Sequence, residues 1–478
     1  MRRFKISVCV ILSILAIILP LALPVVYAFV SPPQYDNTFV GALDKKLERL
    51  QSVEGEKIVV IGGSSVAFGL DSALMEKYTG MPVVNFGLYA ALGTKLMLDL
   101  SRSGIGEGDI VIVSPELDAQ TWSLYFNSKT TLQAFDGNLT SLKYVDSEHA
   151  FSLAGSIWNF AASKLQYQIN GNKPDPDGVY NSKNFNEYGD LVFERNENVM
   201  FGYYELNNLI DPDPDIITDE FVDYMNDYID YCKSKGATVY LSFAPMNELG
   251  VASGATYDDF YEFSDKVEAR INCTLLSDIT TCLYDPGYFY DTNYHLNDIG
   301  VKANTLRLAS DLRIEMGNYE AIGESIPDPL RLPIFDVSYD GEDDENSKYF
   351  VFEEASNGAL SIVGLTELGK KQATLTVPVG YNGKKVIYIS EGAFVGGEVR
   401  TLILTVDTNI RAFAVDSFKG ASTLTDIIIY YMNEADILPP PSFYGASSSL
   451  RVHVPKDSGY ESGYYWSERG LKFVKDID

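Results

Sequence analysis

Two adjacent serines lie where an apolar run of the sequence ends and a helical pattern begins, in the stretch IVVIGGSSVAFGLDS (residues 58–72). A serine hydroxyl becomes a nucleophile when a base removes its proton, and that base is most often a histidine oriented by a carboxylate. Of the three histidines, His149 lies in an irregular stretch and His453 in a strand-like run. His295 follows Asp291 by four residues, on a loop before a helical pattern. The chain therefore carries the three residue types that nucleophilic catalysis by a serine uses, in the order serine, aspartate, histidine.

The segments that must position these residues alternate between strand and helix. Apolar runs predict strands at 57–62, 82–86, 109–113 and 238–244. Helical patterns lie between them, as at 72–78 and 221–234. This alternation predicts an α/β domain with a mostly parallel sheet covered by helices on both faces. Ligands bind at the carboxyl edge of such a sheet, where the first strand would deliver the serines.

The order and context of these residues resemble the SGNH (GDSL-type) hydrolase superfamily over about residues 55–315. The first sequence block of that family is Gly-Asp-Ser with a glycine four residues later, and residues 63–65 with Gly69 take that place. The resemblance implies a three-layer α/β/α fold with Ser65 as the nucleophile. Ser64 is the alternative nucleophile, but it would place the later glycine five residues on.

The resemblance extends to two further blocks. In VVNFGLYAALGT it points to Asn85, with Gly87 or Gly93 as the backbone donor that holds the oxyanion. In the last block it implies that Asp291 orients His295, which deprotonates the serine. The third block, normally Gly-x-Asn-Asp, is replaced by Ser-Pro-Glu at 114–116, so one side-chain oxyanion donor is missing. Loss of one such donor typically costs about 100- to 1000-fold in turnover.

A second region of the chain is periodic. The motif Phe-x-Gly recurs at 394–396, 418–420 and 443–445, at intervals of 24 and 25 residues, and a β-rich run follows each copy. A fixed period of this size predicts a solenoid with one strand per turn, in which the phenylalanines fill the interior. Over about 359–478 the pattern resembles the BspA-type leucine-rich repeat of bacterial surface proteins, in which I-x-x-x-A-F-x-G precedes the strand.

The N-terminus combines basic residues with a long apolar run. Residues 6–30 are 25 consecutive residues without a charge, and Arg2, Arg3 and Lys5 precede them. At about 1.5 Å per residue, a helix of this length spans the roughly 30 Å hydrocarbon layer. The basic flank predicts a single-pass protein of the cell membrane with a cytoplasmic N-terminus and the bulk of the chain extracytoplasmic. The alternative is a secretion signal cleaved near 26–28, which also exports the protein.

The charge and the cysteines exclude several partners. The formal net charge of −29 would repel a phosphate backbone, so no nucleic-acid partner is expected. Cys232, Cys273 and Cys282 lie outside the apolar run and form no CxxC pair, so we expect no metal site, and no cofactor either. The sequence is consistent with a Cys273–Cys282 disulfide and equally with buried free thiols.

These features divide the chain into four segments. They are an N-terminal membrane anchor or signal (1–30), an SGNH hydrolase-like α/β domain (31–325), an acidic, Pro-containing linker (326–350) and β-rich leucine-rich repeats (351–478). Within the second segment, the stretch at about 118–215 is rich in Tyr, Asn, Asp and Phe without a strong period. It predicts an insertion over the sheet, and such insertions often shape a substrate site.

Two classes of function follow. The first is an extracytoplasmic, membrane-anchored serine esterase or O-acyltransferase that acts on a carbohydrate ester of the cell envelope or the extracellular space through an acyl-enzyme. The pattern also resembles the membrane-anchored acyl-transfer proteins of lipoteichoic-acid alanylation and alginate acetylation, which implies an integral-membrane O-acyltransferase as a partner. The second is a non-catalytic surface protein for binding or adhesion, with a degenerate SGNH-like domain, and the missing third-block asparagine favours it.

Overall fold

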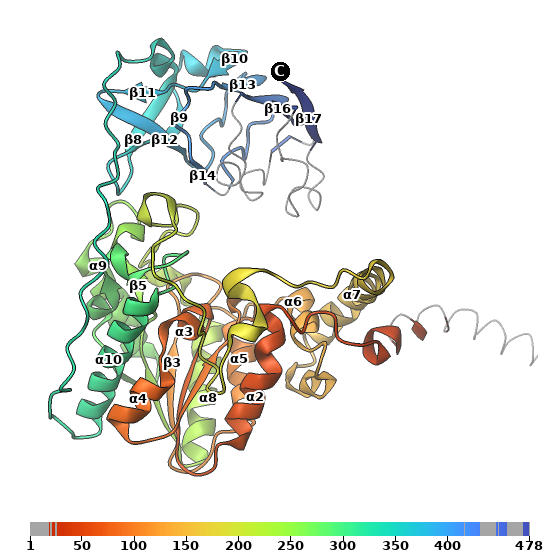
Figure 1. Cartoon of the computed structure of the whole chain (residues 1–478), viewed down its shortest axis with the longest axis vertical. Helices are drawn as coiled ribbons and strands as arrows, with labels where there is room; N and C mark the ends of the chain where they lie inside the picture. Colours follow the sequence, from red (N-terminus) through yellow and green to blue (C-terminus); the bar gives the residue numbers. More distant parts are fainter. Residues whose placement is uncertain are drawn as a thin grey trace, which may run out of the picture. The chain divides into compact units, whose positions relative to one another are not determined.

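The computed structural model describes residues 19, 22–23, 26–414, 416–430, 446–447, 449–456 and 472–477. The chain divides into two compact units (Figure 1). The first comprises Met1–Asn198, Ile210–Glu248 and Ala255–Leu330, and the second comprises Val199–Leu209, Leu249–Gly254 and Arg331–Asp478. The last passage from one unit to the other falls after residue 330, inside the acidic, Pro-containing stretch.

The first unit is built on a five-stranded parallel sheet with the strand order β2-β1-β3-β4-β6. Its strands are β1 (Ile58–Gly62), β2 (Val83–Gly87), β3 (Ile110–Ser114), β4 (Thr238–Leu241) and β6 (Thr274–Leu275). A separate parallel pair consists of β5 (Met246–Asn247) and β7 (Leu283–Tyr284). Every residue of β1, β2 and β3 is buried, as strands covered on both faces must be. The predicted α/β class with a parallel sheet is confirmed.

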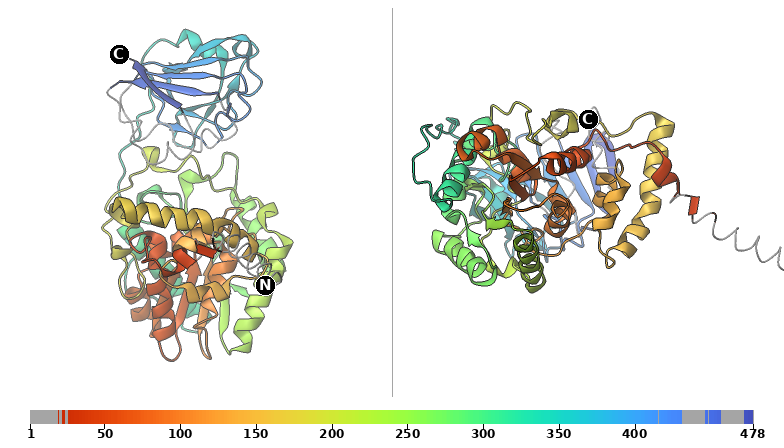
Figure 2. Two further views of the ribbon diagram at one scale, coloured as in Figure 1. Left: turned by 90° about the vertical axis from the view of Figure 1, so that its right-hand side faces the viewer. Right: turned by 90° about the horizontal axis from the view of Figure 1, so that it is seen from below.

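Helices cover both faces of this sheet (Figures 1 and 2). One face carries α3 (Ser64–Gly69), α4 (Ser72–Thr79) and α10 (Asp298–Glu315). Met75 of α4 and Leu308 of α10 pack with Ile58 and Val60 of β1 in one buried cluster. The helices α2 (Leu43–Ser52), α5 (Thr94–Ser101) and α8 (Asp219–Ser234) contact β2, β1 and β4, and α9 (Tyr257–Arg270) follows β5 in the chain.

The insertion after β3 contains α6 (Ser128–Ala134) and α7 (Ala150–Asn170). Lys164 of α7 is the only charged residue of that helix, and it is fully buried in an ion pair with Asp136. Its ammonium also donates to the backbone oxygens of Ala28 and Ser31, at 3.0 and 3.1 Å. The entering chain is therefore tied to α7 by a buried charge.

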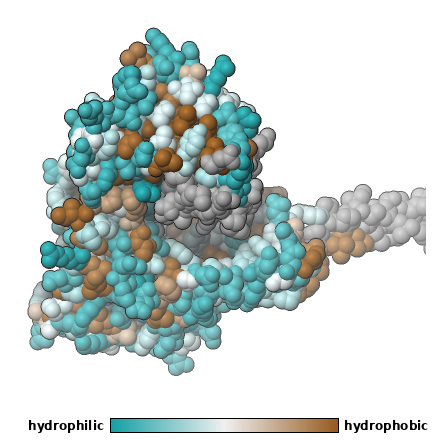
Figure 3. All heavy atoms as spheres, turned by 45° about the horizontal axis from the view of Figure 1, so that its top comes forward, coloured by the Kyte–Doolittle hydropathy of each residue, from teal (hydrophilic) through white to brown (hydrophobic). Residues whose placement is uncertain are grey.

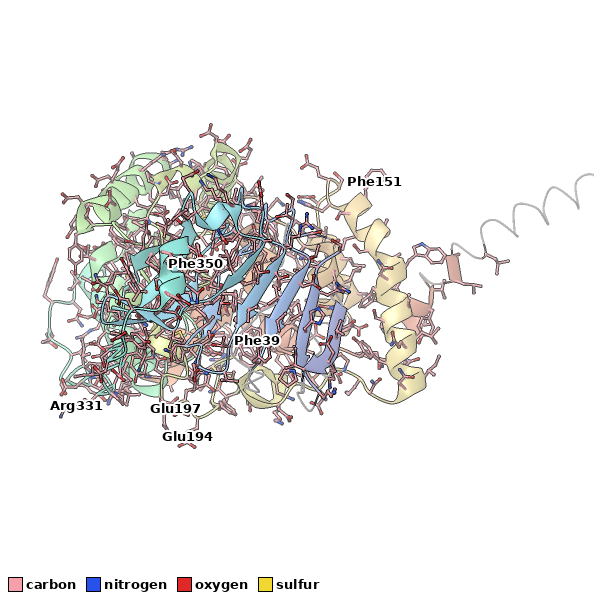
Figure 4. All side chains as sticks on the ribbon, turned by 90° about the horizontal axis from the view of Figure 1, so that it is seen from above. Phe39, Phe151, Glu194, Glu197, Arg331 and Phe350 are labelled. Carbon is pink, nitrogen blue, oxygen red and sulfur yellow. The ribbon has the colours of Figure 1, made fainter. Side chains whose placement is uncertain are left out.

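The outer side of α7 is apolar. Phe151, Trp158, Leu165 and Ile169 are exposed there at helical spacing. Figure 3 shows apolar side chains on the side of the first unit where the described N-terminal residues enter. Figure 4 labels Phe151, which lies at the N-terminal end of α7. The buried side of the helix instead packs against Tyr35 and Ala28.

The second unit consists of two sheets. One is parallel, in the order β10-β13-β15-β16-β17, and the other has the order β11-β12-β9-β8, with β14 paired to β12. The parallel sheet contains β10 (Thr374–Thr376), β13 (Thr401–Leu404), β15 (Asp426–Ile429), β16 (Arg451–Pro455) and β17 (Lys472–Ile477). The other contains β8 (Phe350–Glu354), β9 (Leu360–Leu365), β11 (Gly380–Tyr381), β12 (Lys384–Ile389) and β14 (Ala412–Phe413). The strands β13, β15 and β16 are the runs that follow the three Phe-x-Gly motifs.

The periodic phenylalanines form part of the core of this unit. Phe394 and Phe418 are buried, and their rings stack with centroids 5.5 Å apart. The third motif, at 443–445, lies outside the described residues.

A histidine links three neighbouring strands of the parallel sheet. His453 of β16 contacts Asp426 of β15 at 3.0 Å and Asp476 of β17 at 2.9 Å. Burial lowers the pKa of this imidazole, but the two carboxylates outweigh burial and the pKa is raised.

The structure corrects the expectation about the N-terminus and decides between the two alternatives for the cysteines. Over the described parts of the chain, no helix is long and apolar enough to cross a membrane, which corrects the prediction of a single-pass membrane protein with a transmembrane helix. Most of the apolar run at 6–30, with the basic residues before it, lies outside the described residues. Cys273 and Cys282 are free thiols rather than a disulfide.

The stacked phenylalanines generate a stability prediction. Phe418→Ala should leave a cavity and lower the free energy of unfolding of the second unit by about 3–5 kcal/mol. The control Val406→Ala, at a residue 69% exposed, should change it by less than about 0.5 kcal/mol. Urea denaturation of the full chain, followed by hydrogen exchange in β13 and β15, measures both. Equal effects of the two substitutions would contradict a packed core at Phe418.

Candidate active site

The turn between β1 and α3 places the two serines at the carboxyl edge of the sheet. β1 ends at Gly62 and α3 begins at Ser64, so one residue, Gly63, joins them. A Cβ on Gly62 would lie 2.6 Å from the backbone oxygen of Ser114, and one on Gly63 would lie 2.9 Å from Glu116 Oε1. Two glycines are needed because the turn packs directly against the end of β3.

Ser64, His295 and Asp291 form a hydrogen-bonded trio. His295 Nε2 lies 2.8 Å from Ser64 Oγ, and His295 Nδ1 lies 2.8 Å from Asp291 Oδ1. An ionised carboxylate only accepts hydrogen bonds, so Nδ1 carries the proton and Nε2 is left to accept from the serine hydroxyl. Ser64 and His295 are 9% and 6% exposed. This is the geometry of a serine with its general base and orienting carboxylate.

Ser65, which the sequence resemblance favours, is not the serine in contact with His295. It is fully buried and borders a cavity of about 10 Å³ that Ser114, Ser242 and Arg307 also line. Successive helical residues project about 100° apart, because a turn holds 3.6 residues, so only one of two adjacent serines can face the histidine. Gly69, whose spacing favoured Ser65, has a structural role, since its oxygen accepts from Asn304 Nδ2 at 2.8 Å.

The loop that carries His295 is fixed by its own hydrogen bonds. Tyr290 N–H donates to the His295 oxygen at 2.8 Å, and His295 N–H donates to Thr292 Oγ1 at 3.0 Å. Two residues further on, Asn297 caps α10 by accepting from Gly300 N–H. The helix start and the loop together hold the imidazole at a defined distance from α3.

Aromatic rings hold the plane of the imidazole. Phe68 stacks on His295 with ring centroids 3.8 Å apart and an interplanar angle of 11°. The guanidinium of Arg195 lies over the Phe68 ring at 5.2 Å and forms an ion pair with Asp298. Phe68 follows Ser64 by one helical turn, so both residues face the histidine.

Asp291 is held in its ionised form. Tyr180 donates to Asp291 Oδ2 at 2.6 Å, while His295 occupies Oδ1. Burial raises the pKa of this carboxyl, but the hydrogen bonds and charge of His295 and the hydroxyl of Tyr180 outweigh it, and the pKa lies below its usual value. Tyr180 and Arg195 both come from the insertion after β3. Sequence reasoning did not single them out, because that insertion has no period.

The groups expected to hold an oxyanion have internal partners. Gly87 N–H donates to Asn85 Oδ1 at 3.0 Å, and Gly93 N–H donates to the Ala90 oxygen at 2.9 Å. Asn85 Nδ2 donates to Asp190 Oδ1 at 2.9 Å. Gly93 has a φ of 82°, and a Cβ there would lie 2.0 Å from the Tyr125 oxygen. In this structure these donors are therefore engaged in internal hydrogen bonds.

Glu116 lies beside the peptide group that joins Ser64 to Ser65. It is 7% exposed, and its Oε1 accepts the backbone N–H of Ser65 at 3.1 Å. The buried ring of Trp122 donates to the Glu116 backbone oxygen at 2.9 Å, which fixes the main chain. Burial raises the pKa of the Glu116 carboxyl, and the nearby Asp118 adds to the shift. Among the described residues, no group of three or more His, Cys, Asp or Glu side chains could hold a metal ion.

Comparison of the chain with protein-family models, with curated proteins and with solved structures finds no match in any of the three. The geometry of the trio is therefore the observation from which function must be argued.

The contact between Tyr180 and Asp291 generates a prediction about pH. Because the folded-state pKa of Asp291 is lowered, its contribution to stability is present above the unfolded pKa of about 3.9 and is lost as the pH falls through the folded value. Tyr180→Phe removes one hydrogen bond to a charged group. It should destabilise the first unit by about 1.5–3 kcal/mol at pH 7, and by less in strong acid.

Urea denaturation of the wild-type and Tyr180→Phe chains, at pH 7 and in strong acid, measures how the loss of stability depends on pH. Tyr319→Phe, at a tyrosine 79% exposed, is the control and should have no effect at either pH. An equal loss of stability for Tyr180→Phe at both pH values would mean that its hydroxyl does not act through the charge of Asp291.

Proposed function

We propose that the first unit is an SGNH-type serine esterase or O-acyltransferase domain with Ser64 as its nucleophile. The observation that carries the proposal is the 2.8 Å distance from Ser64 Oγ to His295 Nε2, with Asp291 on the other ring nitrogen. The position of Ser64, at the carboxyl edge of a parallel sheet, supports it as well. With Ser64 as the nucleophile, residues 62–64 take the place of the first family block.

The trio can carry out acyl transfer in two steps. In the first, Ser64 Oγ forms a bond to the acyl carbon while its proton moves to His295 Nε2, and Asp291 stabilises the imidazolium. The proton then passes to the leaving oxygen as the ester bond breaks, which leaves an acyl group on Ser64. In the second, His295 deprotonates water or an acceptor hydroxyl, which takes the acyl group and restores the serine.

A carbohydrate ester is the substrate class that we favour. Tyr89 exposes 40% of its surface, and its ring lies 6.0 Å from that of Phe39. Phe39 in turn contacts the rings of Phe68 and Tyr180 beside the imidazole. An exposed aromatic face joined to the site in this way offers an apolar platform for a sugar ring. If the domain transfers rather than hydrolyses, an integral-membrane O-acyltransferase would be the partner that supplies the acyl group.

The second unit is proposed to be a solenoid of BspA-type leucine-rich repeats. Three features support this assignment: the 24- and 25-residue spacing of the motifs, the parallel register of β13, β15 and β16, and the buried Phe394 and Phe418. Such a unit would serve as a binding or spacing module beside the catalytic one.

A non-catalytic binding role is the second candidate. The observation that favours it is that Glu116 accepts the Ser65 N–H, while Gly87 and Gly93 N–H donate internally. A site with these donors occupied stabilises an oxyanion poorly. The Ser64 hydroxyl would then be one polar group in a ligand-binding surface.

Labelling with a fluorophosphonate decides between the two candidates. Ser64→Ala should abolish labelling of the full chain, whereas Ser65→Ala, a change of the same size one residue away, should retain it. Circular dichroism confirms that both variants are folded. If Ser65→Ala alone loses labelling, the nucleophile is Ser65. If folded wild-type protein is neither labelled at any pH nor active on a small acetyl ester, the binding role replaces the enzymatic one.

A further inference from the structure

We infer that Glu116 acts as an acid in this site: its carboxyl must carry a proton for Ser64 to be acylated, and it then donates a hydrogen bond to the reacting oxygen. The inference rests on the proposed function, because it assigns a role within the same reaction. Glu116 lies at the third-block position, where the family resemblance leads one to expect an asparagine donor. A carboxylate cannot donate, but a protonated carboxyl can.

The position of Glu116 follows from the sheet. β3 ends at Ser114 and pairs with β1 so that Ser114 lies opposite Gly62. The chain that leaves β3 therefore passes beside the turn at 62–65, where Glu116 Oε1 accepts the N–H of Ser65 and would lie 2.9 Å from a Cβ on Gly63. Its Oε1 thus lies at the peptide group that follows Ser64, and the carbonyl oxygen of an ester bound to Ser64, on which negative charge develops, would lie beside it.

The charge of Glu116 decides whether its carboxyl stabilises or destabilises the developing oxyanion. An ionised carboxylate accepts the Ser65 N–H and repels a developing oxyanion in a largely buried site. A neutral carboxyl can keep accepting that N–H through one oxygen while the other donates its proton. The reaction should therefore proceed through the protonated form only.

The surroundings favour this protonated form. The titratable groups that face Glu116 are Asp118 on the same loop and His295 on the loop before α10. Burial and Asp118 raise the pKa of Glu116, while the hydrogen bonds from Ser65 and the charge of His295 lower it by less. Asp118 is itself half-buried with a pKa that burial raises, and it accepts a hydrogen bond from the Thr121 hydroxyl. Protonated Glu116 thus persists to higher pH than an exposed glutamic acid would.

This role of Glu116 predicts a fall in activity on the alkaline side. The rate of acylation should decrease as Glu116 loses its proton. Glu116→Gln supplies a donor that cannot ionise, so it should abolish the fall on the alkaline side. Glu116→Ala supplies no donor, and should lower the rate about 100- to 1000-fold at the wild-type optimum.

The test is the second-order rate constant of fluorophosphonate labelling of the full chain, measured from about pH 4 to about pH 10. We expect Glu116→Gln to react at least about tenfold faster than wild type on the alkaline side, because it alone keeps its donor there. The matched variant Asp118→Asn removes a charge that raises the Glu116 pKa. It should move the alkaline fall to lower pH and leave the acid side unchanged, which loss of structure would not do.

The outcomes separate this inference from the proposed function. If wild-type protein is labelled at Ser64 but Glu116→Gln keeps the alkaline fall, Glu116 is not the acid, and the enzymatic proposal stands. If Glu116→Gln is slower than wild type at every pH, the carboxyl has another role and the inference is overturned. If neither wild type nor Glu116→Gln is labelled at any pH, both the inference and the proposed function fail.

Discussion

The close contact between α3 and the ends of β1 and β2 is the constraint on which the site depends. A Cβ on Gly87 of β2 would lie 2.2 Å from the backbone nitrogen of Ala67, and one on Gly62 of β1 would lie 2.6 Å from Val66 Cγ2. Because no side chain fits at these points, the helix lies directly on the strand ends. Ser64 is thereby fixed in orientation, and His295 meets it from a position 231 residues later in the chain.

Buried polar groups keep this contact in place. Asn85 accepts from Gly87 N–H, while Asp190 accepts from Asn85 and from both the N–H and the hydroxyl of Ser72, so β2, α4 and the insertion share one network. Lys46 donates to the Gly189 oxygen at 2.7 Å, and burial lowers its pKa to about 7 although Asp190 opposes the shift. Such networks specify a unique arrangement only when their members are paired, as these are.

Much of the fold could be predicted from the sequence, whereas the contacts of the site could not. Buried parallel strands appear as uninterrupted apolar runs, and β1 and β3 fall within one residue of their predicted ranges. The choice between Ser64 and Ser65 depends on the rotation of α3 about its axis, which spacing to Gly69 does not encode. The spacing of Ser64 and Phe68, one helical turn apart, places both residues on the face of α3 that meets His295, and this spacing is the sequence signal that favours Ser64.

Tyr180 and Arg195 could not be predicted for a different reason. Tyr180 reaches Asp291, and Arg195 reaches the Phe68 ring, from the insertion, whose path is set by single hydrogen bonds and ring contacts rather than by a repeating apolar pattern. Glu116 was visible in the sequence as a departure from the family block. Its contact with Ser65 N–H required the register of β1 against β3.

The buried bonds of Lys164 and Asp136 to the chain at residues 28–34, here called the Lys164 clamp, have a mechanical consequence. Lys164 holds the Ala28 and Ser31 oxygens, and its partner Asp136 also accepts the N–H of Gln34 at 2.6 Å. Tension applied to the chain ahead of residue 28 is therefore borne by these bonds and by α7 before it reaches α2 and β1, which follow residue 34 in the chain. The clamp can carry a load at one end of the first unit without passing it to Ser64 and His295.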